Sequence, residues 1–185
     1  NRPLDAVDEV APAGSGFLAE LCQAWEAAAQ PARQAGIRVA HLRLGLVLAR
    51  AGGALAPQLL PFSLGLGGAL GSGRQAVSWI ALDDVLGAVE HVLFTPGVAG
   101  AVNVVAPAPV EQREFARALG RVLHRPAVLP LPGTALRLAL GEMGQALLLE
   151  GARVIPARLQ RSGFTFQYPE LLPALRWELG LPEQD

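Results

Sequence analysis

Residues 77–105 read VSWIALDDVLGAVEHVLFTPGVAGAVNVV, and this stretch decides the fold class. The apolar run Val77–Leu82 predicts a short buried strand. The two aspartates that follow stand where a helix would begin, which is favourable against the helix dipole. Valines at helical spacing continue that helix to about Phe94, where a Thr-Pro-Gly sequence ends it. Ala101–Val105 then predicts a second strand, so the stretch is a strand–helix–strand unit.

The same alternation continues on both sides of this unit. Phe17–Gln30 predicts a helix, and the apolar run Ile37–Leu48 predicts a strand buried on both faces, as in a parallel sheet. Further helices are predicted at Leu55–Leu64, Glu111–Leu123, Thr134–Leu149 (with a break at Gly141 or Gly144), Pro156–Gly163 and Pro169–Leu179, and short strands at Ala127–Leu131 and Phe164–Phe166. Alternating strands and helices predict an α/β fold. A soft boundary near Pro107–Pro109 divides the chain into residues 1–106 and 107–185.

The composition narrows the classes of partner. Half of the 185 residues are hydrophobic, which is too high a share for a disordered chain. The net charge of −1 gives no indication of nucleic acid or an anionic membrane surface as a partner. The single cysteine, Cys22, excludes an internal disulfide and a cysteine-based zinc site, and we expect a reducing, cytoplasmic location. Residues 51–73 carry no charge, but seven glycines and two prolines favour a buried or cleft-lining segment over a membrane span.

Four segments resemble the extended short-chain dehydrogenase/reductase superfamily: Arg43–Leu48 (RLGLVL), Trp79–Val85 (WIALDDV), Gly100–Val104 (GAVNV) and the helix Glu111–Leu123. Within it, seven motifs in order resemble the atypical branch called epimerase family proteins, which carries a C-terminal domain of unknown function. They are Leu21–Glu26, Leu60–Gly68, Gly71–Gln75, Leu123–Pro126, Gly141-Glu142, Pro156–Leu159 and Gly163–Phe166.

This resemblance implies an architecture and a cofactor. Residues 1–106 would be the C-terminal portion of a Rossmann-like doubly wound parallel sheet, and residues 107–185 a smaller, mainly helical α/β domain on the substrate side. The cofactor would be NADP(H), or alternatively NAD(H). The Gly-rich strand–turn–helix unit that holds a dinucleotide pyrophosphate is not found in this chain, so an N-terminal Rossmann part would be required. For the glycines at 65–68 and 71–73, close backbone approach is favoured over phosphate binding.

The usual catalytic dyad of the superfamily is absent. Its members use a tyrosine and, four residues later, a lysine on one helix. Aligning Glu26 with the superfamily's helix glutamate puts Leu18 and Cys22 at those positions. No other register supplies them, because the chain has no lysine and its one tyrosine is Tyr168. The catalytic residues are therefore unknown, and for Cys22 we expect burial as a small apolar side chain rather than a nucleophile.

Two sets of ligand contacts are predicted. By resemblance, the backbone of three residues should pass beside the nicotinamide: Gly45, Leu46 and Val47. Three residues near a Gly-flanked loop are candidates for binding substrate: Arg74, Gln75 and Trp79. A guanidinium binds carboxylate or phosphate bidentately, although Arg74 pairing with Asp83 or solvent is an equal alternative. For Trp79, core packing is favoured over lining a pocket.

Other chemistry is not favoured by the sequence. Asp83 and Asp84 are interpreted as a helix start rather than a catalytic carboxylate pair. The three histidines, at 41, 91 and 124, are scattered over three elements, so no metal site is predicted. A triad of Ser72, His41 and Asp83 has no supporting motif.

The function predicted from these residues is that of an NADP(H)-binding epimerase- or oxidoreductase-like protein acting on a small molecule, a carbonyl compound or a nucleotide sugar. We expect this chain alone to be inactive. The absent dyad favours a different class as the alternative, a catalytically silent NADP(H)-dependent sensor or scaffold. A free-standing interaction module is the third interpretation.

Overall fold

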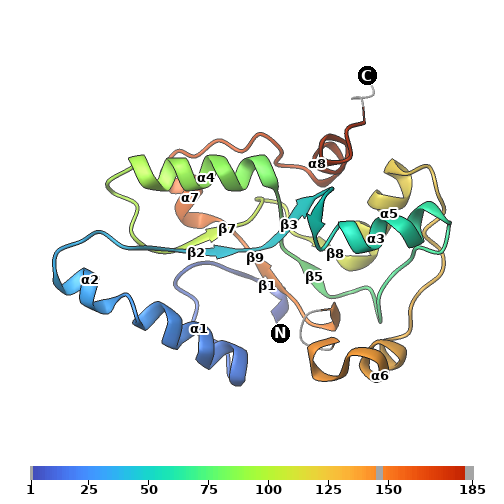
Figure 1. The fold of residues 1–185 in the computed structure, drawn as a ribbon, viewed down its shortest axis with the longest axis horizontal. Coiled ribbons are helices and arrows are strands. Elements are labelled where there is room, and N and C mark those ends of the chain that lie inside the picture. The colour runs from blue at the N-terminus through green and yellow to red at the C-terminus, as the bar shows by residue number, and fades with distance from the viewer. Residues whose placement is uncertain (1, 145–147, 182–185) are drawn as a thin grey trace.

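The N-terminal layer is a parallel pair of strands with a helix on each face (Figure 1). The computed structural model describes residues 2–144 and 148–181. Strand β2 (Ala40–Leu44) pairs in parallel with β7 (Gly100–Val104), from Ala40 opposite Gly100 to Leu44 opposite Val104. Helix α4 (Leu82–Phe94) lies above this pair in Figure 1 and α1 (Phe17–Ala27) below it. The predicted α/β class with parallel strands is confirmed.

The remaining elements are short. The helices are α2 (Gln30–Gln34), α3 (Ala56–Ser63), α5 (Gln112–Val122), α6 (Gly133–Gly144), α7 (Ala157–Arg161) and α8 (Leu171–Glu178). The strands are β1 (Arg2–Val7), β3 (Leu46–Ala49), β4 (Gly52–Gly53), β5 (Ala76–Val77), β6 (Trp79–Ala81), β8 (Val110–Glu111) and β9 (Ala152–Val154). β3 lies between β4 and β6, β5 pairs with β8, and β1 pairs in parallel with β9 from the other end of the chain. No helix in the described ranges is both long enough and apolar enough to span a bilayer.

The prediction of one continuous strand at Ile37–Leu48 was wrong, because the chain changes neighbours at Gly45. Before Gly45 the chain pairs with β7, and after it with β6. A Cβ on Gly45 would lie 2.5 Å from the Ser78 carbonyl oxygen and 2.6 Å from Val105 Cγ1, so the crossing has no room for a side chain. Burial on both faces was also wrong, since Leu44 is 56% exposed.

Two predicted short strands are not formed. Residues 127–130 run beside the glycine-rich stretch as irregular backbone, with the Leu129 N–H donating to the Gly67 carbonyl at 3.1 Å, and Leu131 forms a single isolated parallel bridge with Leu70. A Cβ on Gly68 would lie 2.1 Å from the Leu129 carbonyl oxygen, so glycine is needed here for close backbone approach. In 164–166 the rings of Phe164 and Phe166 pack edge to face at 4.8 Å instead of forming a strand.

The helix predicted at Thr134–Leu149 is present in part. Helix α6 is interrupted at Gly141, whose φ of 60° and ψ of −144° are not helical, at one of the two predicted breaks. The continuation of this prediction through residues 145–147 lies outside the described residues.

The larger core joins the two halves of the sequence. It contains Trp79 and Leu48 from the first 106 residues together with Phe115, Leu119 and Leu175 from the rest. The domain boundary between residues 106 and 107 stays a prediction. Residues from both sides of it pack in this one core.

The two aspartates at the start of α4 hold the C-terminal segment against this core. The carboxylate of Asp84, which is 1% exposed, accepts the N–H groups of Gln167 (2.7 Å) and Tyr168 (3.0 Å). Asp83 accepts the Trp177 indole N–H from α8. Both side chains therefore have structural partners at the position where the sequence predicts a helix start.

Candidate functional site

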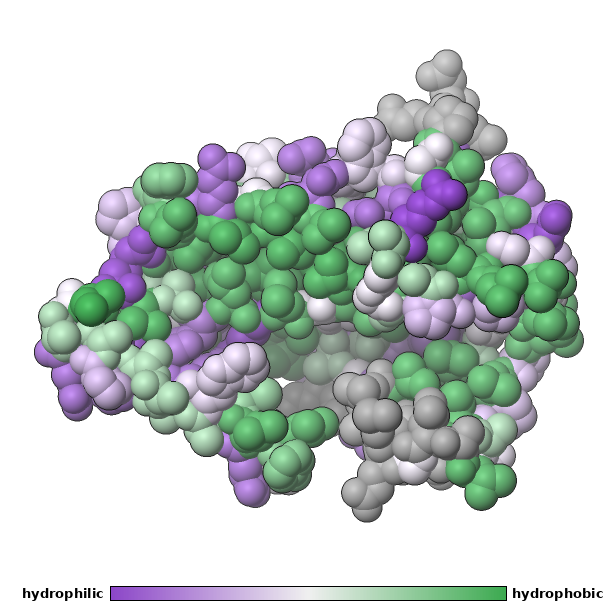
Figure 2. All heavy atoms as spheres, in the orientation of Figure 1, coloured by the Kyte–Doolittle hydropathy of each residue, from purple (hydrophilic) through white to green (hydrophobic). Residues whose placement is uncertain are grey.

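An open cleft of about 900 Å³ lies between α1 and the β2 side of the sheet. Its walls are one face of α1, the strand β2, the segment at residues 7–14, and single residues from neighbouring strands. The surface is hollowed below α4 in the view of Figure 2, beside apolar side chains. The lining of the cleft includes the titratable side chains of Cys22 and Glu26 from α1 and of His41 and Arg43 from β2.

The Glu26–Arg43 pair crosses the cleft between α1 and β2. Arg43 Nε and Nη2 donate to the two carboxylate oxygens of Glu26 at 2.7 and 2.8 Å. Hydrogen bonding to Arg43 lowers the pKa of Glu26, and the same bond raises the pKa of Arg43. Because one edge of the guanidinium, Nε and Nη2, is bound bidentately by the Glu26 carboxylate, the charge of Arg43 is paired and Arg43 ties α1 to β2.

The two positions aligned with the missing dyad have different surroundings. Cys22 lines the cleft on the same face of α1 as Glu26, whereas Leu18 is 52% exposed outside the lining. The expectation that Cys22 is buried was wrong, because no part of the described chain covers this face of α1. Neither side chain supplies the proton donor of the superfamily.

His41 was considered from the sequence only as a metal ligand or a member of a triad, and the structure places it at this cleft. It lines the cleft, and its Nε2 is buried without a hydrogen-bond partner among the described residues. His41 and Arg43 are two residues apart on β2, so their side chains lie on the same face of the strand. This alternation was the one signal in the sequence that places His41 beside Arg43.

Glu9 is a residue that sequence reasoning missed. It is 7% exposed, and its Oε1 accepts the N–H groups of Asn103 and Arg158, each at 3.1 Å. Asn103, which lines the cleft, in turn donates from Nδ2 to the Ile155 carbonyl at 3.1 Å. Glu9 therefore ties the segment that forms one wall to β7 and α7. Nothing in the local sequence marks this glutamate as buried.

The predicted nicotinamide contacts separate in the structure. Gly45 lines the cleft, but its lack of a side chain is already required by the packing against Ser78 and Val105. Leu46 and Val47 pack against the two hydrophobic cores and are not among the lining residues. Cofactor contact stays a prediction for all three.

The predicted substrate contacts lie away from the cleft, and none of the three is among its lining residues. Arg74 is exposed. Gln75 is buried and its Nε2 donates to the carbonyls of Leu70 (2.9 Å) and Leu148 (2.8 Å). Trp79 has no exposed surface, and its Nε1 donates to the Ala108 carbonyl at 3.0 Å. Substrate binding stays a prediction for Arg74, while Gln75 and Trp79 have structural partners.

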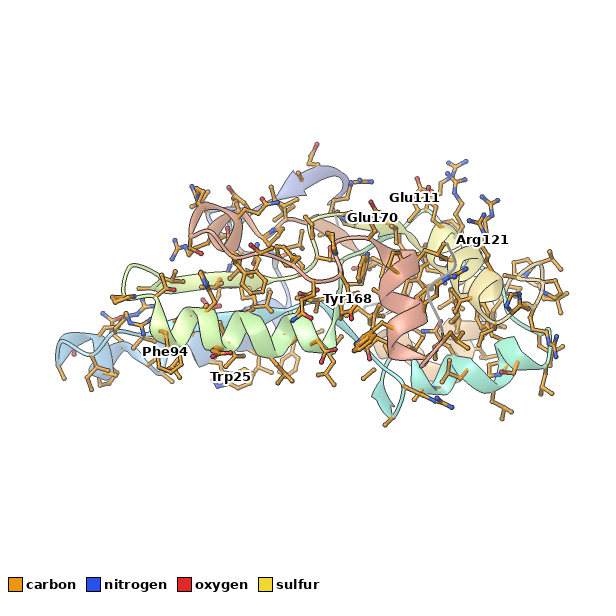
Figure 3. All side chains as sticks on the ribbon, turned by 90° about the horizontal axis from the view of Figure 1, so that it is seen from above. Trp25, Phe94, Glu111, Arg121, Tyr168 and Glu170 are labelled. Carbon is orange, nitrogen blue, oxygen red and sulfur yellow. The ribbon has the colours of Figure 1, made fainter. Side chains whose placement is uncertain are left out.

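Other catalytic arrangements are not assembled in the described parts of the chain. Ser72 accepts the Arg74 N–H in an exposed loop, and Asp83 is bonded to Trp177, so neither adjoins His41 in the cleft. Tyr168 stacks on Trp177 at 5.5 Å beside α8 (labelled in Figure 3) and is not a lining residue. Within residues 2–144 and 148–181, no group of three potential metal ligands comes together.

Comparison with known proteins gives a consistent result. Residues 131–178 match a domain of unknown function, DUF1731. The epimerase family protein MT2273 of Mycobacterium tuberculosis is 47% identical over 176 residues, which is 95% of this chain and 58% of that protein. The chain thus spans a little over half the length of such relatives.

Two solved structures extend the comparison. The human epimerase family protein SDR39U1 (isoform 2), solved with NADPH, superposes with a TM-score of 0.90 and 39% identity, covering 96% of this chain and 60% of that one. A nucleoside-diphosphate sugar epimerase from Corynebacterium glutamicum gives a TM-score of 0.79 and 31% identity, covering 97% of this chain and 34% of that one. The chain therefore belongs to the epimerase family proteins, an atypical branch of the extended short-chain dehydrogenase/reductase superfamily.

Proposed function

We propose that this chain is the substrate-side half of an NADP(H)-binding protein of the epimerase or oxidoreductase type, acting on a carbonyl compound or a nucleotide sugar. The observation that carries the proposal is the likeness to the human family member solved with NADPH, at 39% identity over 96% of this chain. The cleft adds support, since it reaches Gly45, the residue where resemblance puts the nicotinamide.

The residues present fit one end of the cofactor only. Leu44, which precedes Gly45 in the chain, and Val105, whose Cγ1 packs against Gly45, give the cleft an apolar lining there, which suits a flat ring. Arg43 is engaged by Glu26, and no Gly-rich strand–turn–helix unit occurs among the described elements to hold the phosphates. The phosphates would therefore be bound by an N-terminal Rossmann part. When bound, NADP(H) would supply or accept a hydride.

Proton transfer is the step that this chain leaves open. His41 lines the cleft, its Nε2 is buried there without a hydrogen-bond partner among the described residues, and histidine is the side chain most often used for general acid–base catalysis, so it is our candidate proton donor. The alternative is an NADP(H)-dependent sensor without turnover. The missing tyrosine and lysine favour that alternative.

The test is made on this chain fused behind the part of the M. tuberculosis relative that lies outside the matched region. NADPH binding is measured by fluorescence titration, and NADPH oxidation against a panel of carbonyl compounds and nucleotide sugars. Turnover that falls at least tenfold in His41→Gln, with NADPH affinity unchanged, supports the enzyme and the role of His41. Binding without turnover supports the sensor. A fused protein that folds and does not bind NADPH contradicts both.

A further inference from the structure

Acidic and basic residues are distributed unevenly along this chain. Residues 51–82 and 115–141 contain five arginines and not one aspartate or glutamate. These two segments therefore carry a formal charge of +5 and the rest of the chain −6, which together give the net charge of −1. The small net charge is thus the sum of two unlike parts, and such an asymmetry is typical of a protein whose basic part binds an anionic partner.

The two segments without acidic residues lie against each other in the structure. The Leu131 N–H donates to the Ala69 carbonyl at 2.8 Å. Just after α5, Arg125 Nε donates to the Ser63 carbonyl at the end of α3, also at 2.8 Å. Figure 1 shows α3 and α5 together at one end of the molecule, with α2 at the other. The two segments therefore meet at the end of the molecule opposite α2.

Two arginines on the outer face of α5 have no acidic partner in the described ranges. Arg113, Arg117 and Arg121 recur every four residues, so they share one face of the helix. Arg113, in the first turn, is paired with Glu111 at 2.6 Å. Arg117 and Arg121 are exposed and form no ion pair with any residue that the structure describes. Figure 3 shows Arg121 at the end of the molecule opposite Phe94. The charges of Arg117 and Arg121 are therefore open to an anionic partner.

An apolar patch adjoins these arginines. Its members lie on α3, on the loop after α3 and on the irregular segment that runs beside that loop. Each is between 45% and 71% exposed: Leu60, Leu64, Leu66, Val128, Leu129 and Leu131. Figure 2 shows apolar side chains gathered over α3. Single exposed apolar side chains are ordinary on a protein surface, whereas a contiguous group of them marks an interaction site.

We propose that this end of the molecule binds anionic lipid bilayers through a basic–apolar surface, made of Arg117, Arg121 and Arg125 together with the six side chains of the apolar patch. The leucines and the valine enter the boundary between the headgroups and the acyl chains, and the arginines bind the lipid phosphates. An arginine stem can lie along apolar surface while its guanidinium reaches the headgroups, so both kinds of side chain act together. None of these residues lines the cleft, so this binding is independent of the proposed function.

Other anionic partners match the basic–apolar surface less well. Single-stranded nucleic acid binds by stacking its bases on aromatic side chains. The aromatic residues of the two segments are all buried: Phe62, Trp79 and Phe115. Protein interfaces draw most of their binding energy from tryptophan, tyrosine and arginine, and leucine and valine are under-represented among their strongest contacts. Aliphatic side chains beside unpaired arginines therefore favour a lipid surface.

The test mixes this full chain with lipid vesicles and measures binding by flotation. One set of vesicles is phosphatidylcholine alone, and the other contains phosphatidylglycerol as well, which makes it anionic. We expect binding to the anionic set only, and weaker binding as the salt concentration rises. Arg117→Glu with Arg121→Glu, and separately Leu64→Gln with Leu66→Gln, should each weaken binding by about tenfold or more. Arg117→Lys with Arg121→Lys should retain it, because attraction to anionic lipid depends on the charge.

Matched controls carry the same chemical changes elsewhere on the molecule. Arg33→Glu with Arg161→Glu reverses two exposed charges outside the two segments. Leu93→Gln with Phe94→Gln removes two exposed apolar side chains at the other end of the molecule. Both controls should bind anionic vesicles as the wild-type chain does. Circular dichroism of each variant shows that it is folded.

Binding to anionic vesicles that is lost in both surface variants and kept in the controls supports the inference. No binding of the wild-type chain to anionic vesicles overturns it, as does binding that either surface variant leaves unchanged. A chain that does not bind vesicles, but binds single-stranded DNA or associates with itself through Arg117 and Arg121, also overturns it and assigns the arginines to that partner.

Discussion

Two tryptophans illustrate the contrast between the two regions of this molecule. Trp79 has no exposed surface and packs with α5 and α8, whereas Trp25 on α1 is 79% exposed. Helix α5 buries Phe115, Leu119 and Val122 within the chain, while α1, also of 11 residues, buries none. The first region, around Trp79, is completed by its own sequence. The second, around α1, leaves its large apolar side chains exposed within the described residues.

The largest expected effect tests this contrast directly. Trp79→Ala should lower the free energy of unfolding by about 3–5 kcal/mol, because it opens a cavity in the larger core. Trp25→Ala is the matched control and should change it by no more than about 0.5 kcal/mol. Urea unfolding followed by circular dichroism measures both. Similar losses for the two substitutions would contradict the contrast.

The next largest effect concerns a carboxylate that joins the C-terminal segment to the first region. Asp84→Ala removes the buried carboxylate that accepts the N–H groups of Gln167 and Tyr168, and it should destabilise the protein by about 2–4 kcal/mol. Asp83→Ala, which removes a less buried acceptor of the Trp177 indole, should cost less than about 1 kcal/mol. Equal costs in the same unfolding experiment would show that burial of Asp84 is not decisive.

Gly45 lies where the two regions meet, and its substitution tests that junction. In Gly45→Ala the new Cβ meets the Ser78 carbonyl and Val105, so we expect a loss of about 1–3 kcal/mol in the free energy of unfolding. Gly52→Ala places a Cβ where no atom lies within 4 Å, and it serves as the control. A Gly45→Ala protein as stable as wild type would mean that the two strands separate easily at this point.

The smallest effect is the pH dependence of the Glu26–Arg43 pair in the second region. The pKa of Glu26 is lowered from 4.5 by its hydrogen bond to Arg43, so the unfolded chain takes up a proton at this carboxyl before the folded one does. The stabilisation is therefore present above pH 4.5 and is lost as the pH falls through the lower folded value.

Because both side chains are partly exposed, Glu26→Gln should cost only about 0.2–1 kcal/mol at neutral pH, and the difference from wild type should shrink in acid. Unfolding measured over a pH series gives this difference, with Glu20→Gln on the exposed side of the same helix as control. A difference that grows as the pH falls would contradict the sign.

Local signals predicted the regular elements well. The helix expected at Glu111–Leu123 is α5 at Gln112–Val122, and its first turn has the capping box of Glu111 and Glu114. The helix expected after Leu82 begins at that residue. Such elements depend on spacing and end signals within one segment, and these can be read from the sequence.

The site was predicted less well, because its members depend on distant segments. His41 lines the cleft together with Arg43, which lies two residues further along β2 and binds Glu26 of α1. Glu9 is buried because β7 and α7 bring two N–H groups to it. The pairing of β1 with β9 joins opposite ends of the chain. None of these partners lies within the range of a local pattern.

The sequence by itself determined the family and the absent dyad, since seven ordered motifs carry the first, and a chain with no lysine and one tyrosine cannot contain the second in any fold. Only the tertiary structure decided which apolar side chains are covered, that Gln75 and Trp79 have partners in the protein interior, and that β2 pairs with β7. The physical reason is that composition and spacing belong to one segment, whereas burial and strand pairing depend on whatever other segment packs against it.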